Sequence, residues 1–432
     1  MRKSPLRPFA MSVCGLLIAQ LSLAASFDVA QNSSKLIEIK VTGSERFPQD
    51  TLIAATGLKL GADGGDDSLK EAANRLASSG MFSDVTYRYV SSPQGTKAEF
   101  QVHDTTKLFP ASFDNFVWLA RDELIRRLKS KDPLFQGEIP NAGEMSQHVA
   151  DSTKAVLQDL GVPADVKVFP QVPPEGGEIT GFLYQVTGVR IPMRTIVFSG
   201  ASPTMIAVLN KLAETSLLGN DYSEASVRSV ARLDFLPQYQ MRGFLRAAFA
   251  TPAPLLQDRA TGTVTVTLPV SEGLCYRLSS VQWSGNTVFS SAELEKAVKA
   301  QLGVAANQVA LEEGLGGLAT IYGTKGYMEA QLKPEYHFDD TAETVAVDVG
   351  VHEGDQYRMG QLQFLGITDS ASAPLRKLWK LHGGDVYDSS YPTVFFASVG
   401  RQFDLSRFLV GVSHKLQRES KTVDVFIQLS AQ

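Results

Sequence analysis

The chain has 432 residues, 44% of them hydrophobic, and a formal net charge of −5 at pH 7. This composition is ordinary for a globular protein and supports a buried core, and the length alone suggests about three domains. The acidic balance argues against a nucleic-acid-binding protein, which would carry a basic stripe.

Residues 1–25 have the pattern of a Sec signal peptide. Three basic residues precede a short apolar run, Met11–Leu23, and small residues suited to cleavage follow at Ala24 and Ala25. An uncleaved membrane anchor is the alternative, but the apolar run is short for one. Lipidation at Cys14 is disfavoured because Val13 stands where a small residue would be needed.

Loss of the signal peptide would change the net charge to about −8 and leave Cys275 as the single cysteine. The mature chain would then have no internal disulfide, so its stability must come from packing. We expect Cys275 to be part-buried between two repeats, with an intermolecular disulfide as the alternative. No segment after residue 26 resembles a transmembrane helix of about 20 residues.

The clearest folding unit spans residues 274–354. A strand with alternating faces ends at Gly285, and Ser290 with Glu293 predicts a capped helix that Gly303 would end. A second helix is expected over Leu311–Thr324.

The same unit continues with Gly326, which is expected to end the second helix. Two alternating strands follow, near Ala330–His337 and Val345–Val351, with Asp339 and Asp340 in the turn between them. One sheet covered by two helices is a sensible two-layer α+β domain.

The same order of elements recurs along the chain. The glycines before the second strand lie at positions 80, 161, 243 and 326, with steps of 81, 82 and 83 residues. The predicted units are 36–104, 105–190 (degenerate), 191–273, 274–354 and 355–431. We expect the recurring glycines to be structural turns and not ligand contacts: Gly43, Gly80, Gly161, Gly200, Gly243, Gly285, Gly326 and Gly366.

This pattern of a strand ending in Gly285-Asn286, two helices, Gly326-Tyr327, a hairpin and a terminal Glu353-Gly354 resembles POTRA (polypeptide-transport-associated) domains. These domains occur in outer-membrane protein assembly factors and two-partner-secretion transporters. The resemblance implies a tandem α+β array of small β-α-α-β-β domains, each a three-stranded mixed sheet covered by two helices. Those proteins continue into an outer-membrane β-barrel, whereas this sequence stops at Gln432, so we expect an array without the barrel and do not transfer insertase activity.

The resemblance implies a non-enzymatic protein that docks partners or holds extended clients. Its partners would be unfolded or nascent outer-membrane or secreted proteins, or components of outer-membrane β-barrel assembly. Its place would be the periplasm, at the inner face of the outer membrane, after Sec export. The alternatives are an envelope adaptor or spacer that binds one folded partner, and a barrel-less remnant of an assembly factor.

An extended peptide can pair with a free strand edge through main-chain hydrogen bonds. In this family the second strand is usually the exposed edge, here Asp84–Val90, Leu245–Ala250 and Ala330–His337. The residues expected to contact clients are Val85, Tyr87, Tyr89, Leu245, Ala247, Leu332 and Tyr336. The alternative is that these edges are merely solvated, or blocked by Pro252 and Pro334.

We find no sequence pattern for catalysis, a cofactor or a metal. The six histidines form no pair with metal-ligand spacing, and the glycines at 314–317 lack the Lys-Ser/Thr of a phosphate loop. We expect Asp66-Asp67 and Asp339-Asp340 to be solvated loop charges, with weak calcium binding as the alternative.

Overall fold

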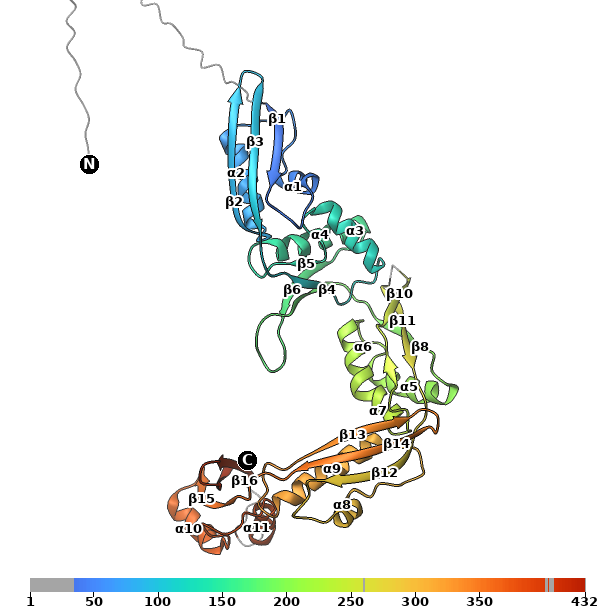
Figure 1. Cartoon of the computed structure of the whole chain (residues 1–432), viewed down its shortest axis with the longest axis vertical. Coiled ribbons are helices and arrows are strands. Elements are labelled where there is room, and N and C mark those ends of the chain that lie inside the picture. Colours follow the sequence, from blue (N-terminus) through green and yellow to red (C-terminus); the bar gives the residue numbers. More distant parts are fainter. Residues whose placement is uncertain (1–34, 259–260, 401–402, 404–407, 432) are drawn as a thin grey trace, which may run out of the picture. The chain divides into compact units, whose positions relative to one another are not determined.

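The computed structural model describes residues 35–258, 261–400, 403 and 408–431 (Figure 1). The predicted signal peptide lies outside these residues. The chain divides into two compact units, one formed by residues 1–110 and 128–149 and the other by residues 111–127 and 150–432. Strand β4 (Phe109–Phe113) and helices α3 (Arg121–Lys131) and α4 (Met145–Asp159) pass from one unit to the other.

Five sheets in the described chain share one topology. In each sheet the first strand runs parallel to the third, and the second strand is antiparallel to the third. The third strand therefore lies between the other two, which form the edges except in the second sheet, where β5 pairs with the outer side of β4. The strand orders are β1-β3-β2, β4-β7-β6, β8-β11-β10, β12-β14-β13 and β15-β17-β16, with β5 beside β4 and β9 beside β11. The predicted fold class, tandem α+β repeats with mixed sheets and helices, is confirmed.

The first compact unit contains the whole of the first repeat. Its elements are β1 (Leu36–Thr42), α1 (Gln49–Thr56), α2 (Asp66–Ser78), β2 (Phe82–Ser92) and β3 (Gly95–Asp104), and this unit also holds β5 (Glu138–Ile139). Helix α2 forms here because Leu69, Ala72, Ala73 and Leu76 recur at helical spacing and bury one face.

The second compact unit holds the later repeats. After the elements that it shares with the first unit, it contains β6 (Asp165–Gln171), β7 (Gly181–Thr187), β8 (Met193–Ser199), α5 (Pro203–Ser216), α6 (Glu224–Val230), a π-helical segment (Ala231–Phe235), α7 (Leu236–Gln240), β9 (Ala248–Phe249), β10 (Ala253–Asp258) and β11 (Thr263–Ser271). The fourth repeat contains β12 (Arg277–Ser284), α8 (Ser291–Val298), α9 (Gln308–Gly323), β13 (Gln331–Asp339) and β14 (Thr344–His352). The fifth contains β15 (Arg358–Leu365), α10 (Asp369–Leu378), α11 (Tyr391–Val399), β16 (Phe408–Gln417) and β17 (Thr422–Ala431).

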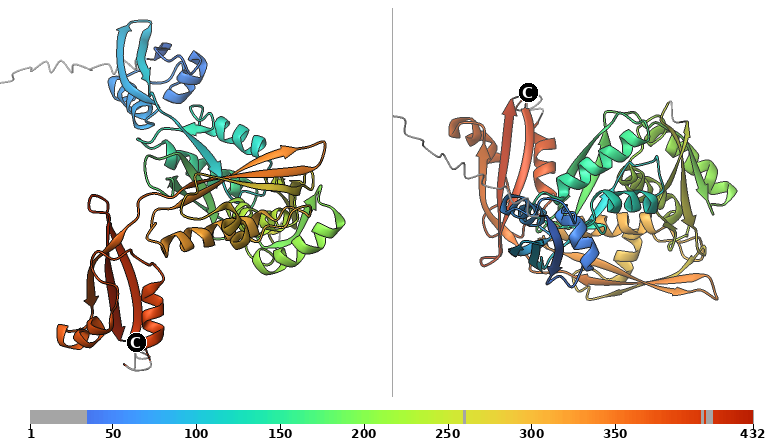
Figure 2. Two further views of the ribbon diagram at one scale, coloured as in Figure 1. Left: turned by 60° about the horizontal axis from the view of Figure 1, so that its bottom comes forward. Right: turned by 90° about the horizontal axis from the view of Figure 1, so that it is seen from above.

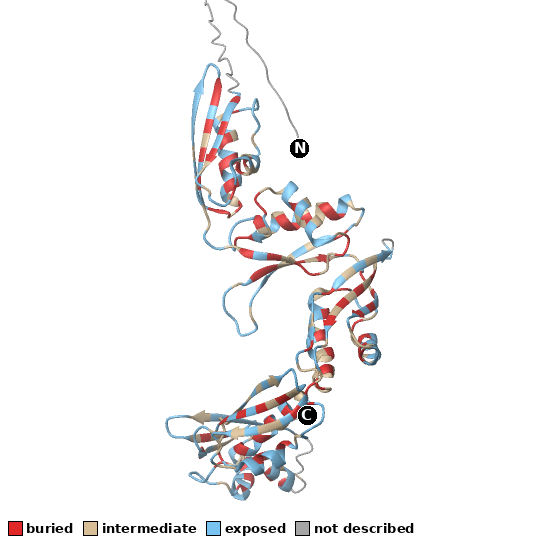
Figure 3. Cartoon of the chain, turned by 45° about the vertical axis from the view of Figure 1, so that its right-hand side comes forward, coloured by how far each residue is buried: buried red, intermediate tan, exposed pale blue. Residues whose placement is uncertain are grey.

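Alternation along the middle strand builds the core of the fourth repeat. The four valines of β14 that face the helices are buried, and they pack with the buried stripe of α9 in one cluster. Burial of each such side chain contributes roughly 1.5–3 kcal/mol. Figure 3 shows the same pattern along the chain, with buried and exposed residues alternating on the strands.

The first helix of the fourth repeat begins as predicted but ends early. Ser290 and Glu293 form the predicted capping box. The helix stops at Val298, and not at Gly303, because Lys299 adopts a left-handed conformation with φ of 57°. Leu302, which a longer helix would have buried, is 58% exposed.

The eight recurring glycines all have positive φ, between 72° and 103°. Gly285 shows why one of them must lack a side chain. A Cβ there would lie 2.4 Å from the carbonyl oxygen of Val351 at the end of the middle strand. The equivalent glycines at 43, 200 and 366 meet the carbonyls of Val102, Val270 and Leu429 in the same way.

Candidate functional site

The outer edge of β13 is the best-formed candidate surface. This strand and β14 form the long orange hairpin in Figure 2. Strand β13 pairs with β14 from Gln331↔His352 to Asp339↔Thr344, and its other edge pairs with no described strand. Exposed and half-buried residues alternate strictly along it, with Leu332 and Tyr336 on the half-buried side.

The opposite edge of this sheet is closed at its start by the chain itself. The N–H of Leu278 on β12 donates to the carbonyl of Val304 at 3.0 Å, and Gly303 donates to the carbonyl of Leu278 at 2.8 Å. Ala306 donates to the carbonyl of Tyr276 at 2.8 Å. The α8–α9 loop thus occupies the main-chain positions at the start of β12, so β13 is the more accessible edge.

A cavity of about 310 Å³ lies on the helix-covered side of β13, between the end of α8 and the start of α9. Its inner wall is formed by buried core side chains, its mouth by exposed residues of the α8–α9 loop, and one side by two residues of the third repeat. The lining includes Met241, Leu245, Leu278, Ala306, Tyr336 and Val347.

Tyr336 contributes a buried polar group to this cavity, whose lining also includes Lys299, Gln301, Asn307 and Gln308. Its hydroxyl oxygen is buried and has no hydrogen-bond partner among the described residues. Burial raises the pKa of Tyr336 to about 12, with a further contribution from the carboxylate of Glu312. The side chain therefore stays a neutral phenol at physiological pH and can donate or accept one hydrogen bond.

A polar cluster joins the third repeat to the fourth beside this cavity. Arg246 Nη1 lies 3.0 Å from Asp340 Oδ1, and the Tyr276 hydroxyl donates to the same oxygen at 2.8 Å. The guanidinium also lies 4.1 Å from the ring centroid of Phe338 on β13. Asp340 lies in the hairpin turn with its side chain 59% exposed, as expected for a solvated loop charge, and it also pairs with Arg246 of the preceding repeat.

The junction between the fourth and fifth repeats uses equivalent positions with reversed charge. Glu329 stands three residues after Gly326, as Arg246 stands three residues after Gly243. Arg418 Nη2, in the β16–β17 turn, lies 2.7 Å from Glu329 Oε1, and the Tyr357 hydroxyl donates to Glu329 Oε2 at 2.5 Å.

A family model described as "POTRA: Surface antigen variable number repeat" matches residues 276–354. The matched segment is the fourth repeat, whose strand order the other four sheets share. The chain is a tandem array of POTRA-like domains.

Relatives of this POTRA array are found among assembly factors. A Treponema pallidum (strain Nichols) protein named "Putative outer membrane protein assembly factor" is 27% identical over 65% of this chain and 34% of its own length. The "Outer membrane protein assembly factor BamA" of Neisseria meningitidis serogroup B (strain ATCC BAA-335 / MC58) is 20% identical over 52% of this chain and 29% of its own. The chain thus spans about a third of the length of these curated relatives.

Two solved structures have similar chains. A crystal structure of POTRA domains 3 to 5 of Haemophilus influenzae BamA has 24% identity and a TM-score of 0.46, and covers 55% of this chain and 96% of that one. POTRA domain 4 of the same protein has 29% identity and a TM-score of 0.18, and covers 19% of this chain and 95% of that one.

The structure places the predicted client-contact residues of the first POTRA repeat on β2, an edge strand. Val85 and Tyr87 are half-buried, and Tyr89 is exposed. The Tyr87 ring stacks on Phe100, and its hydroxyl donates to Asp66 Oδ1 at 3.2 Å. Asp66 and its neighbour lie in the first turn of α2, so their assignment to a loop was wrong; carboxylates there stabilise the helix terminus.

The strand predicted over Leu245–Ala250 is shorter and broken. The chain turns before it, since the N–H of Ala247 donates to the Phe244 carbonyl at 3.2 Å. Two short edge strands, β9 and β10, follow on either side of Pro252, which has no N–H to donate to a sheet.

The structure nevertheless brings two predicted residues together. Leu245 leaves its own sheet and lines the cavity of the fourth repeat beside Tyr336. Ala247 lies elsewhere, at a groove between the π-helical segment and β9. The placement of Leu245 could not be predicted from strand periodicity, because it depends on how the third repeat packs on the fourth.

Strand β16 is an edge that the sequence interpretation did not select. It exposes Leu409, Val410 and Val412 at the side of the fifth sheet. The signal was present in the sequence as an apolar run after Phe408, but this repeat lacks the Gly-aromatic pair that marks the second strand elsewhere.

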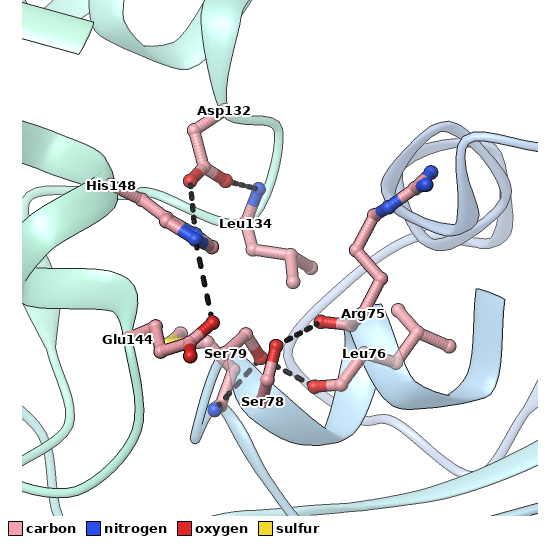
Figure 4. Close-up of polar contacts among 9 residues, drawn as sticks. Arg75, Leu76, Ser78, Ser79, Asp132, Leu134, Glu144 and His148 are labelled. Atoms are coloured by element: carbon pink, nitrogen blue, oxygen red, sulfur yellow. Dashed lines mark hydrogen bonds and ion pairs between the residues drawn. The ribbon is translucent and has the colours of Figure 1, made fainter. Parts of the chain in front are cut away.

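Figure 4 shows a group of titratable residues in the first compact unit. His148 lies between two carboxylates, 4.0 Å from Asp132 Oδ2 and 3.8 Å from Glu144 Oε2. Burial raises the pKa of Asp132, while its hydrogen bond from Leu134 opposes the shift. The Glu144 N–H donates to the carbonyl of Ser78 at 2.7 Å, which ties this group to the end of α2.

Within the described ranges, no cluster of three or more His, Cys, Asp or Glu residues is arranged to hold a metal ion. Cys275 is half-buried, and its Sγ lies 3.2 Å from the carbonyl oxygen of Arg242. Burial raises the pKa of this thiol. None of the described helices is both long and apolar enough to cross a membrane.

Proposed function

We propose that this POTRA array is a non-enzymatic periplasmic protein that docks partners and holds extended polypeptides during outer-membrane protein assembly or secretion. The observation that carries the proposal is the free edge of β13, in a sheet whose opposite edge, β12, is closed at its start by the α8–α9 loop. A free edge presents unpaired N–H and C=O groups at the strand spacing, so an extended chain can add to it through main-chain hydrogen bonds.

The chemistry of β13 suits a varied set of clients. Main-chain pairing requires little of the client's sequence, as a protein that handles many precursors needs. The exposed side chains Lys333, Glu335 and His337 point away from the core and keep the edge soluble. Pro334 removes one N–H from the strand and leaves the remaining positions able to pair.

The names of the relatives support the setting. Both are named as outer membrane protein assembly factors, and the similarity covers more than half of this chain. We therefore propose that the protein acts in the periplasm, at the inner face of the outer membrane, after export by Sec. Its partners on this proposal are unfolded outer-membrane or secreted proteins, together with components of the assembly machinery.

The proposal is tested with the mature chain and synthetic segments taken from outer-membrane β-strands. Binding is measured by fluorescence anisotropy for each peptide and for a copy in which alternate main-chain amides are N-methylated. Strand addition predicts that several unrelated peptides bind and that methylation of the edge-facing amides abolishes binding. Equal binding by the methylated copies, or binding by a single folded partner alone, would contradict it.

A further inference from the structure

The loop between the two helices carries one position that differs between repeats. It is occupied by Tyr222, Ala306 and Tyr387. These residues are structurally equivalent because each donates its N–H to the carbonyl of a residue just before the first strand of its own sheet. The acceptors are Ile191, Tyr276 and Tyr357, at 2.8, 2.8 and 3.0 Å. The backbone is therefore the same in three repeats, and the side chain changes.

In the third and fifth repeats the tyrosine fills its own domain. Tyr222 is 2% exposed and Tyr387 is 0% exposed. In the fourth repeat Ala306 is as deeply buried, at 4% exposure, but has no ring. Ala306 lines the cavity of about 310 Å³. This cavity therefore lies where the neighbouring repeats place a tyrosine ring.

The edge-strand residue that faces the tyrosine ring in the fifth repeat, His414, is equivalent to Tyr336 in the fourth repeat. In the fifth repeat Tyr387 packs on His414 of the edge strand, with ring centroids 5.6 Å apart. His414 pairs with Val425 of the middle strand, as Tyr336 pairs with Val347. Tyr336 is larger than His414 and takes some of the space, yet the cavity remains and the Tyr336 hydroxyl has no partner among the described residues.

We propose that the cavity of the fourth repeat takes one aromatic side chain from the polypeptide that adds to β13. This inference rests on the proposed function, because the bound strand must first pair with that edge. Side chains of an added strand alternate between the two faces of the sheet, so every second one points to the helix side, where the cavity lies.

The size and lining of the cavity fit a ring. An apolar protein cavity of about 150 Å³ is large enough to bind benzene. The present cavity is larger, and its inner wall is made of Leu278, Val347 and similar apolar side chains. The Tyr336 phenol stands where His414 meets a ring in the fifth repeat, so it can pack against a client ring and bond to a client hydroxyl.

The test uses the mature chain and one extended peptide series that carries Tyr, Phe, Leu or Ala at a single position, scanned along the peptide. We expect Tyr and Phe to bind about tenfold or more tightly than Ala at one register. The decisive variant is Ala306→Tyr, which restores the residue of the third and fifth repeats. It should bind the Ala peptide as the wild type does and lose the preference for aromatic residues.

A second variant guards against misfolding of the first. Ala310 is exposed at the first turn of α9 and lines the cavity, so Ala310→Trp should narrow the mouth without entering the core. An aromatic preference that persists in both variants would overturn the inference, as would equal binding of all four peptides to the wild type. Equal binding would leave strand addition intact, whereas no binding by any peptide would overturn strand addition as well.

Discussion

The fourth and fifth repeats have one backbone design and different interiors. A Cβ on Gly285 would lie 2.4 Å from a carbonyl oxygen of the middle strand, and one on Gly366 would lie 2.2 Å from the equivalent oxygen. In the same fold the loop residue is Ala306 in one repeat and Tyr387 in the other, so one repeat has a cavity where the other has a ring. The topology fixes the turns, and the side chains of the loop are left to vary.

The largest expected effect comes from breaking the shared turn. Gly285→Ala forces a side chain into the Val351 carbonyl at a φ of 77°, so we expect a loss of about 3–5 kcal/mol in the free energy of unfolding of the fourth repeat. Hydrogen exchange on β14 measures this loss.

Gly161→Ala is the matched control for this turn. Gly161 has a φ of 75°, but no atom lies within 4 Å of a Cβ placed there. Its cost should be the backbone strain alone, about 1–2 kcal/mol. Equal losses in the two variants would show that the close approach of the carbonyl is not the reason for the glycine.

The interiors of the two repeats can be exchanged. Tyr387→Ala removes a fully buried ring, so we expect a loss of about 3–5 kcal/mol for the fifth repeat. Ala306→Tyr fills an existing cavity, so its cost should stay under about 1.5 kcal/mol. Hydrogen exchange on β17 measures the effect in the fifth repeat, and exchange on β14 measures it in the fourth. Similar losses in the free energy of unfolding in both variants would contradict the equivalence of these positions.

Glu353, at the end of the fourth repeat, should make a pH-dependent contribution to the free energy of unfolding. Burial disfavours the charged form of Glu353, but hydrogen bonds from Thr287, Val288 and Tyr322 outweigh it, so the pKa of Glu353 is lowered. The unfolded chain then binds more protons between the folded and unfolded pKa values. The stabilisation is therefore present at neutral pH and is lost as pH falls through the folded pKa.

Glu353→Gln should cost about 1–3 kcal/mol at neutral pH and progressively less as the solution is acidified. Denaturant titration of the wild type and the variant between neutral and acidic pH measures the difference. Glu335→Gln, at an exposed position of β13, serves as the control and should change little. A difference that stays constant with pH would contradict the assigned role of the charge.

The smallest effect is expected at the junctions, where the charges are reversed between equivalent positions. The Arg246–Asp340 pair is about half exposed, so it should contribute no more than about 1 kcal/mol. Arg246→Glu should weaken the docking of the third repeat on the fourth, and adding Asp340→Arg should restore it. A double-mutant cycle on unfolding measures the coupling, and a coupling of zero would show that the pair does not hold the junction.

Much of this fold could be predicted from the sequence, because its signals are local. The alternation from Val345 to Val351 gave the middle strand, and Ser290 with Glu293 gave the helix start. The end of that helix could not be predicted, because a lysine at φ of 57° has no sequence signal. The break in the edge strand of the third sheet was not predicted. Pro252 interrupts a strand only if its position would have donated an N–H to the sheet, and the sequence alone does not show this pairing.

The candidate site was predictable only in part. The β13 edge follows from the topology that the family resemblance implied. The cavity does not, because it depends on aligning Tyr222, Ala306 and Tyr387, and their equivalence is visible only in the hydrogen bonds that the loop makes with the first strand. The role of Leu245 was also hidden, since it packs against the next repeat along the chain.

The central claim is that extended polypeptides add to the free edge of β13. A photo-crosslinking residue placed at Lys333 on this strand, and at the exposed Glu295 of α8 as a control, tests it with a peptide from an outer-membrane β-strand. We expect strong crosslinking at position 333 that unlabelled peptide abolishes, and little at position 295. Equal crosslinking at the two positions would contradict the claim.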